Sequence, residues 1–155
     1  MEYIKSLGKS SGCFLCEAAA ATDPAKQREL LMLWSTDLTL VLLNRFPYAN
    51  GHLLIAPRAH KGDLEELTEP EQLDLSRQTL AAVKLLKRAV SAQGFNIGIN
   101  LGTTAGAGLP GHVHQHVVPR WGGDTNFMSV VGETRVVPEA LSRMYEELVK
   151  CRSEL

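Results

Sequence analysis

The chain has 155 residues, and its 16 lysines and arginines nearly balance 17 aspartates and glutamates, for a formal net charge of -1. This length suits one ordinary domain with an apolar core, so we expect a single domain over residues 1–155. The near-zero net charge provides no field to hold a polyanion, so a nucleic acid polymer is not an expected partner. Residues 1–12 are polar, without the apolar run of a signal peptide or membrane span, so we expect a cytoplasmic protein with no membrane partner.

Short apolar runs near the start of the chain are typical of strands. Residues 29–34 and 38–43 are separated by a short polar stretch, which predicts two strands joined by a tight turn. A third strand is predicted over residues 52–56, where Pro57 ends it. These runs together predict a three-stranded meander.

A long helix is predicted after the meander. Thr68, with Glu71 three residues later, matches a capping box that begins a helix over residues 69–93. The apolar residues that recur at roughly helical spacing are Leu73, Leu80, Val83, Leu86 and Val90.

The rest of the chain completes an α+β fold. Strands are predicted over residues 95–101 and 112–118, with a glycine-rich stretch between them. A helix is predicted over residues 138–149, with Leu141 and Met144 on its apolar face together with Leu148. The expected architecture is a mainly antiparallel sheet with one long central helix and a C-terminal helix.

Three histidines alternate along the strand predicted over residues 112–118. His112, His114 and His116 are expected to project to one face, and Val113, Gln115 and Val117 to the other. Alternate residues lie about 6.6 Å apart, so neighbouring imidazoles can share a phosphate group while the outer two cannot converge on one small ion. A purely structural row would leave buried polar groups unsatisfied at about 1–3 kcal/mol each, so we favour a functional one.

A glycine-rich loop over residues 105–111 lies just upstream of the histidines. At Gly106 and Gly108 the missing side chains let a ligand approach the backbone, and consecutive N–H groups can form an anion-binding nest. The same composition is also typical of a flexible hairpin connection. We favour an anion-binding loop because the stretch lies directly before the histidines.

Cys13 and Cys16 have the spacing of a zinc-binding pair, and a tetrahedral site needs two further ligands, for which His60 and His112 are the candidates. The alternative is a redox pair. Such a pair typically opens a helix after a strand, whereas this one is expected in a polar N-terminal stretch. Zinc would here be structural and would contribute to folding.

Residues 111–120, Gly-His-Val-His-Gln-His-Val-Val-Pro-Arg, resemble the signature of the histidine-triad (HIT) superfamily. The similarity extends to residues 44–47 and 51–57, which look like that family's first nucleotide-binding strands. Residues 121–128 most resemble the branch of diadenosine polyphosphate hydrolases and bacterial diadenosine tetraphosphate phosphorylases. The resemblance covers roughly residues 13–128.

The resemblance implies a role for each of several site residues. His114 would be the nucleophile that forms a nucleotidyl-imidazole intermediate, and His116 would contact the phosphate. Asn44 matches a ribose- or nucleotide-binding position and His52 a neighbouring one. Asn100 falls near a phosphate-site residue that is often glutamine, so it departs from the pattern.

The resemblance also implies a metal site and a homodimer. In zinc-containing members the metal ligands correspond to Cys13, Cys16, His60 and His112. Fragile-histidine-triad hydrolases usually lack the cysteines, so the chain mixes features of two branches.

The leading prediction is an enzyme that cleaves the phosphoanhydride of a diadenosine polyphosphate or related adenylated substrate through a covalent nucleotidyl-histidine, with water or phosphate as acceptor. A neutral imidazole is a competent nucleophile near pH 7, and no catalytic metal is required. A nucleotidyltransferase is less favoured, because galactose-1-phosphate uridylyltransferases, which resemble this family, have glutamine where this chain has His116. The alternative is a nucleotide-binding, zinc-organised adaptor with negligible turnover.

Overall fold

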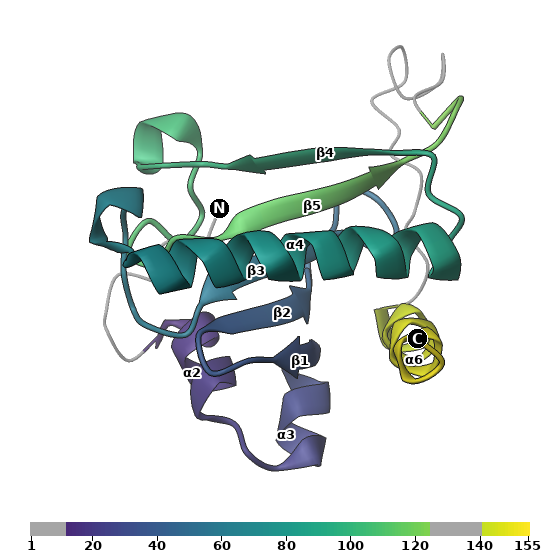
Figure 1. Ribbon diagram of the computed structural model, residues 1–155, viewed down its shortest axis with the longest axis horizontal. Helices are drawn as coiled ribbons and strands as arrows, with labels where there is room; N and C mark the ends of the chain where they lie inside the picture. The colour runs from purple at the N-terminus through teal and green to yellow at the C-terminus, as the bar shows by residue number, and fades with distance from the viewer. Residues whose placement is uncertain (1–11, 125–140) are drawn as a thin grey trace.

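The computed structural model describes residues 12–124 and 141–155, and Figure 1 shows a long helix lying across an open sheet. Its helices and strands are α2 (Phe14–Ala20), α3 (Pro24–Glu29), β1 (Met32–Ser35), β2 (Thr39–Leu43), β3 (Leu53–Pro57), α4 (Glu69–Ala89), β4 (Gly94–Ile99), β5 (Gln115–Arg120) and α6 (Leu141–Ser153). Short 3-10 turns lie at Leu64–Glu66 and Thr103–Ala105. Within the described ranges, no helix combines the length and apolar character needed to cross a bilayer.

The five strands form one sheet in the order β1-β2-β3-β5-β4, and every neighbouring pair is antiparallel. The predicted meander is therefore confirmed as β1-β2-β3. β5 lies between β3 and β4 and is therefore an interior strand, while β4 is an edge strand (Figure 1). The predicted α+β class, with a long helix and a C-terminal helix, is also confirmed.

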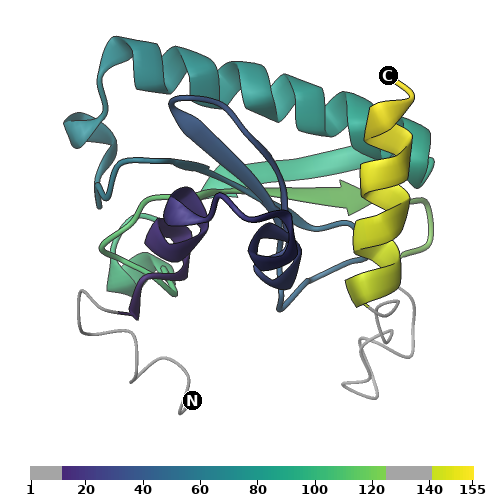
Figure 2. The same cartoon turned by 90° about the horizontal axis from the view of Figure 1, so that it is seen from below.

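Both faces of the sheet carry helices, as Figure 2 shows with α4 on one face and α2 on the other. The α4 face holds the larger core, which includes Val41, Ile55, Leu75, Leu85, Leu86 and Val117. The α2 face buries a smaller cluster that includes Leu15, Ala18, Leu40, Leu42 and Ala56. Along β2, Val41 and Leu43 belong to the larger core and Leu40 and Leu42 to the smaller cluster, so both faces of this strand are apolar after Thr39.

α4 differs from the prediction at its end and at two positions of its apolar face, whereas Leu86 is buried and Val83 and Val90 pack against the larger core as predicted. The predicted capping box is present: the Glu71 N–H donates to Thr68 Oγ1 at 3.3 Å, and the Thr68 N–H donates to Glu71 Oε2 at 2.8 Å. The helix ends at Ala89 rather than at residue 93, because Ser91 adopts a positive φ of 52°. Leu73 and Leu80 are 52% and 56% exposed and therefore lie outside the core, contrary to the prediction.

Two N-terminal helices were missed. α2 begins directly after Cys13, so the expectation that the cysteine pair lies outside a helix is wrong. α3 has Asp23 as its N-cap and Pro24 in its first turn, which is a helix-start signal visible in the sequence. Because Glu29 belongs to α3, the first strand begins at Met32 and not at residue 29.

The strand that carries the histidines begins three residues later than predicted, at Gln115. The His112 N–H donates to the Leu109 carbonyl in a turn, and the Val113 N–H donates to the Lys61 carbonyl at 2.7 Å. The expectation of one strand carrying all three imidazoles is therefore wrong, since only His116 lies in β5.

The C-terminal helix is present as α6, and it continues to Ser153, four residues beyond the prediction. Residues 138–140 lie outside the described residues. Met144 and Leu148 are buried, and Leu141 packs against the larger core, as the predicted apolar face requires.

Candidate active site and metal centre

Four side chains expected in the nucleotide site lie close together on the sheet. His116 is in β5, His114 lies just before it, His52 precedes β3, and Asn44 follows β2. The ring centroids of His114 and His116 are 5.1 Å apart, and His52 Nε2 lies 2.9 Å from His116 Nδ1. Asn44 Nδ2 lies 3.3 Å from His52 Nδ1. Segments distant in sequence thus form one cluster of polar rings.

The hydrogen bonds of this cluster fix which nitrogen of each ring holds the proton. A backbone N–H can only donate, so His52 Nδ1 accepts from the Tyr48 N–H at 3.1 Å. Nε2 of the neutral His52 ring therefore carries a proton, which it donates to His116 Nδ1. The proton of a neutral His116 is then on Nε2, where it is left to donate to a ligand.

His114 presents the opposite pattern. Its Nδ1 lies 2.9 Å from the main-chain carbonyl of His112, and because a carbonyl only accepts, Nδ1 must carry the proton. The Nε2 atom of a neutral His114 ring therefore has a lone pair. A ring nitrogen with a lone pair beside a ring N–H donor suits nucleophilic attack on a phosphate whose oxygens need donors.

The two rings beside His114 are uncharged at neutral pH. Burial, and then the neighbouring imidazoles of His116 and His114, lower the pKa of His52 to about 3. Burial and then the neighbouring His114 ring lower the pKa of His116 to about 4. The site therefore recognises an anion mainly through hydrogen bonds from neutral groups.

The other predicted phosphate-site residues are Asn100, Gly106 and Gly108. Asn100 directly follows Ile99, the last residue of β4, which pairs with Gln115 at the start of β5. Gly106 has a φ of 88° and, like Gly108, is exposed. A Cβ added at Gly106 or at Gly108 would meet nothing within 4 Å.

Two residues of this region were missed in the sequence. Gly98 is paired with His116 across β4 and β5, and a Cβ at Gly98 would meet nothing within 4 Å, so the sheet surface beside His116 is open. A glycine inside a strand is the signal that could have revealed it. Tyr48, whose N–H sets the proton position of His52, left no signal because any residue except proline supplies that group.

A second cluster brings together the four predicted metal ligands. The ligand atoms of Cys13, Cys16, His60 and His112 all lie within 4.8 Å of one another. Cys13 Sγ is 3.2 Å from His112 Nδ1, and Cys16 Sγ is 3.2 Å from His60 Nδ1. Ligands on a tetrahedral zinc ion stand roughly 3.5 Å apart, so the donor set and its spacing fit that ion.

The surroundings of this cluster orient its ligands. His112 Nε2 lies 2.8 Å from the Pro57 carbonyl, to which it donates, so its Nδ1 is left for a metal. Burial and the adjacent Cys13 raise the pKa of Cys16 to about 11, which disfavours two thiolates in the absence of a cation. A bound divalent ion would reverse that preference.

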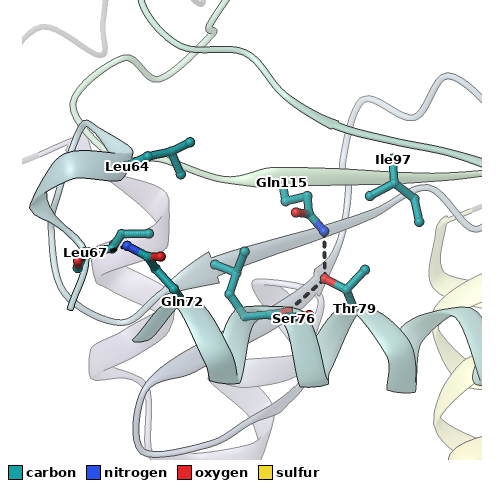
Figure 3. Close-up of a pocket in the computed structure, with 8 residues that line it drawn as sticks. Leu64, Leu67, Gln72, Ser76, Thr79, Ile97 and Gln115 are labelled. Atoms are coloured by element: carbon teal, nitrogen blue, oxygen red, sulfur yellow. Dashed lines mark hydrogen bonds between the residues drawn. The ribbon is translucent and has the colours of Figure 1, made fainter. Parts of the chain in front are cut away.

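A separate hollow lies on the opposite face of the sheet from His116. Its volume is about 370 Å³, and Figure 3 shows it between α4 and the edge strand, lined by residues that include Leu64, Ser76, Ile97 and Gln115. Gln115 Nε2 donates to Thr79 Oγ1 at 2.7 Å, so Gln115 faces α4 as predicted. This hollow is not the histidine site, because alternate residues of a strand face opposite sides.

Comparison with known proteins agrees with this architecture. The sequence profile of the HIT domain matches residues 25–123, and the chain belongs to the HIT family. A Zn-bound histidine triad family protein from Mycobacterium smegmatis has a TM-score of 0.67 and 25% identity, over 94% of this chain and 96% of that one. That residues 1–155 form a single HIT-like domain stays a prediction.

Two curated relatives have named activities. The chain is 44% identical to AP-4-A phosphorylase of Mycobacterium tuberculosis H37Rv over 104 residues, 67% of this chain and 53% of that protein. It is 34% identical to asymmetrical bis(5'-nucleosyl)-tetraphosphatase of Schizosaccharomyces pombe over 89 residues, 57% of this chain and 48% of that protein. The chain thus spans about half the length of each.

Proposed function

We propose that this protein cleaves the phosphoanhydride bridge of diadenosine polyphosphates or related adenylated compounds, with phosphate or water as the acceptor. The observation that carries the proposal is the pairing of His114, whose Nε2 has a lone pair, with His116, whose Nε2–H is left to donate. The activities named for the mycobacterial and yeast relatives support this substrate class. The adaptor alternative gives no reason for two adjacent imidazoles with opposite proton positions.

The reaction proceeds in two displacements. In the first, the His114 Nε2 lone pair forms a bond to the α-phosphorus, the bond from phosphorus to the bridging oxygen breaks, and the leaving nucleotide departs as its phosphate anion. The attacking ring keeps its Nδ1 proton and becomes positively charged, and the His112 carbonyl stabilises that charge. In the second, an oxygen of phosphate or water attacks the phosphorus, and the electron pair of the nitrogen–phosphorus bond returns to His114 Nε2. When the acceptor is water, one of its protons stays on the product and the other is released to solvent.

The remaining residues hold the substrate. His116 Nε2–H donates to phosphate oxygens, and we assign Asn100 and the backbone of Gly106 and Gly108 to the same anion. Asn44 is assigned to the ribose. His52 is fully buried, so we place it behind His116 as a positioning residue that acts by fixing the proton on that ring.

Cys13, Cys16, His60 and His112 are proposed to hold a structural zinc ion. It would join the start of α2 to the segment after β3 and to the turn before β5. The support is the fit of the four donor atoms and the Zn-bound structural relative. A site with two reduced thiolates suits a reducing compartment, so we also place the protein in the cytoplasm, which cell fractionation tests.

A homodimer is proposed through the β4 edge. Among residues 12–124 and 141–155, β4 pairs on one side only, with β5, and Ile97 within it and Leu101 just after it are 47% and 38% exposed. On α4, Leu73 and Leu80 are also exposed, and the residues that precede them in the sequence, Gln72 and Thr79, line the hollow of Figure 3. Open apolar edges favour pairing with another chain. Sedimentation of the protein and of an Ile97→Lys variant tests this, because a dimer in both or a monomer in both would contradict it.

Product analysis tests the function itself. The purified protein is incubated with diadenosine tetraphosphate, with and without phosphate, beside a His114→Ala variant. ADP plus ATP identifies phosphorolysis, and AMP plus ATP identifies hydrolysis. Nucleotide binding without products from the unmodified protein would reject the enzyme and support the adaptor.

A further inference from the structure

Tyr48 is an exposed aromatic residue that lies against the histidine cluster. It belongs to the loop between β2 and β3, and 67% of its surface is exposed. Its ring centroid is 4.7 Å from that of His52 and 6.0 Å from that of His116, to which it is nearly parallel at 21°. An isolated exposed ring is ordinary, but this one extends a stack of rings that begins at the proposed nucleophile.

The rings run in one direction from His114. The centroids of His114 and His116 are 5.1 Å apart, those of His116 and His52 are again 5.1 Å apart, and Tyr48 adjoins the latter two. One face of the Tyr48 ring is turned to these histidines, and its large exposure leaves the other side open to solvent. The ring therefore offers a flat apolar surface at the end of the row away from His114.

The loop holds this ring in place before any ligand arrives. The Tyr48 N–H donates to His52 Nδ1, and the Phe46 N–H donates to Asn44 Oδ1 at 3.0 Å. Pro47 lies between these two anchored residues and restricts the backbone further. A stacking ring that is already ordered loses little entropy on binding.

The position of the ring matches one part of a dinucleotide. In-line attack by His114 places the leaving oxygen on the far side of the phosphorus, so the leaving nucleotide extends away from His114. Because the neutral rings of His52 and His116 bring no full positive charge, base stacking would supply affinity that charge does not. Purines stack on aromatic faces through their π systems, whereas a phosphate has no flat apolar face to offer.

We propose that Tyr48 forms a subsite for the base of the leaving nucleotide, on which the second purine of a dinucleoside polyphosphate stacks. The inference rests on the proposed function, since it takes His114 as the attacking residue. It makes Tyr48 a determinant of preference for substrates with two nucleosides over substrates with one.

The test compares two ligands that differ only in the second nucleoside, diadenosine tetraphosphate and adenosine 5'-tetraphosphate. Their dissociation constants are measured by calorimetry in a His114→Ala background, so that turnover does not interfere. With Tyr48 present we expect diadenosine tetraphosphate to bind about tenfold more tightly. Tyr48→Phe should keep this preference, while Tyr48→Ala and Tyr48→Leu should abolish it and leave the binding of adenosine tetraphosphate unchanged.

Equal binding of the two ligands with Tyr48 present, or an unchanged preference in both Tyr48→Ala and Tyr48→Leu, overturns the subsite. Loss of affinity for both ligands by the same factor would also overturn it, because that pattern reflects damage to the histidine cluster. Products formed by the unmodified protein without any ligand preference would reject the subsite alone. Absence of binding by either ligand, together with absence of products, would reject the proposed function as well.

Discussion

The main-chain carbonyl of His112 accepts a hydrogen bond from Nδ1 of His114 at 2.9 Å, while the side chain of the same His112 belongs to the metal-ligand cluster. One residue therefore serves both sites. A change that releases the His112 ring from Cys13 and Cys16 removes one of the contacts that hold this residue, beside its bonds to the Leu109 and Pro57 carbonyls. The metal site and the histidine site are expected to respond together.

Loss of the cysteine pair should remove the metal, lower stability and reduce turnover. A Cys13→Ser, Cys16→Ser double variant is expected to contain no stoichiometric zinc and to unfold at least about 10 °C lower, because structural zinc contributes on the order of 10 kcal/mol to folding. Cys151→Ser is the matched control, since Cys151 lies outside the cluster. Elemental analysis and thermal unfolding check this, and zinc retained by the double variant would reject the site.

His52→Ala should impair both folding and catalysis without removing a group that touches substrate. The variant leaves the Tyr48 N–H and His116 Nδ1 without their partner, at about 1–3 kcal/mol for each buried unsatisfied group. His116 can then place its proton on either nitrogen, so we expect kcat to fall roughly 10–100-fold. Denaturant unfolding and steady-state kinetics measure the two effects. Unchanged kcat would show that His52 does not position His116.

Acid should destabilise the fold through the buried neutral histidines. The pKa values of His52 and His116 are lowered from 6.5 to about 3 and about 4. The unfolded chain therefore binds more protons below pH 6.5, and the free energy of unfolding falls by up to about 1.4 kcal/mol per pH unit for each histidine until the folded protein also binds them.

A His116→Gln variant isolates one of these contributions. Between pH 6 and about 4, its free energy of unfolding should fall less steeply than that of the parent. The reason is that only the parent has an imidazole at position 116 that binds a proton on unfolding. Metal content is followed across the same range, because acid also protonates thiolates. Parallel curves for the two proteins would contradict the account of His116.

Gly62 lies where two segments approach closely, and a side chain there should destabilise the protein. A Cβ at Gly62 would stand 2.9 Å from the Pro110 carbonyl oxygen, a backbone atom that moves only with the loop before His112. We expect Gly62→Ala to cost about 1–3 kcal/mol. The control is Gly108→Ala, where a Cβ meets nothing within 4 Å, and its effect should be within about 0.5 kcal/mol. Denaturant unfolding of both variants decides whether this approach matters.

Much of the candidate site could be predicted because its chemistry depends on which residue types are present and on their spacing in the sequence. Histidines at alternate positions and a paired-cysteine spacing identify the two clusters, and the structure brings all four predicted metal ligands together. The boundary of β5 could not be predicted, because residues 112–114 have the alternation of a strand. In the structure the His112 N–H instead bonds to the Leu109 carbonyl in a local turn, and the Val113 N–H bonds to the Lys61 carbonyl of a loop distant in sequence.

The error about Leu73 and Leu80 on α4 also arose because the sequence pattern alone does not show where the sheet lies. Leu73 and Leu80 are seven residues apart and share a helical stripe, but the core lies beneath the stripe of Leu75 and Ala82. Both stripes contain apolar residues, and only the position of the sheet distinguishes them. The role of Tyr48 was equally hidden, because it depends on a backbone N–H and on a ring placed by the fold.

The central claim is a covalent nucleotide on His114, and trapping it is the most direct test. The protein is mixed with diadenosine tetraphosphate without phosphate, quenched during the first turnover, digested and examined by mass spectrometry. The account predicts an adenylyl group on the peptide at His114, and neither adduct nor turnover in the His114→Ala variant. Turnover by that variant at the parent's rate, or an adenylyl group found on another residue, would contradict it.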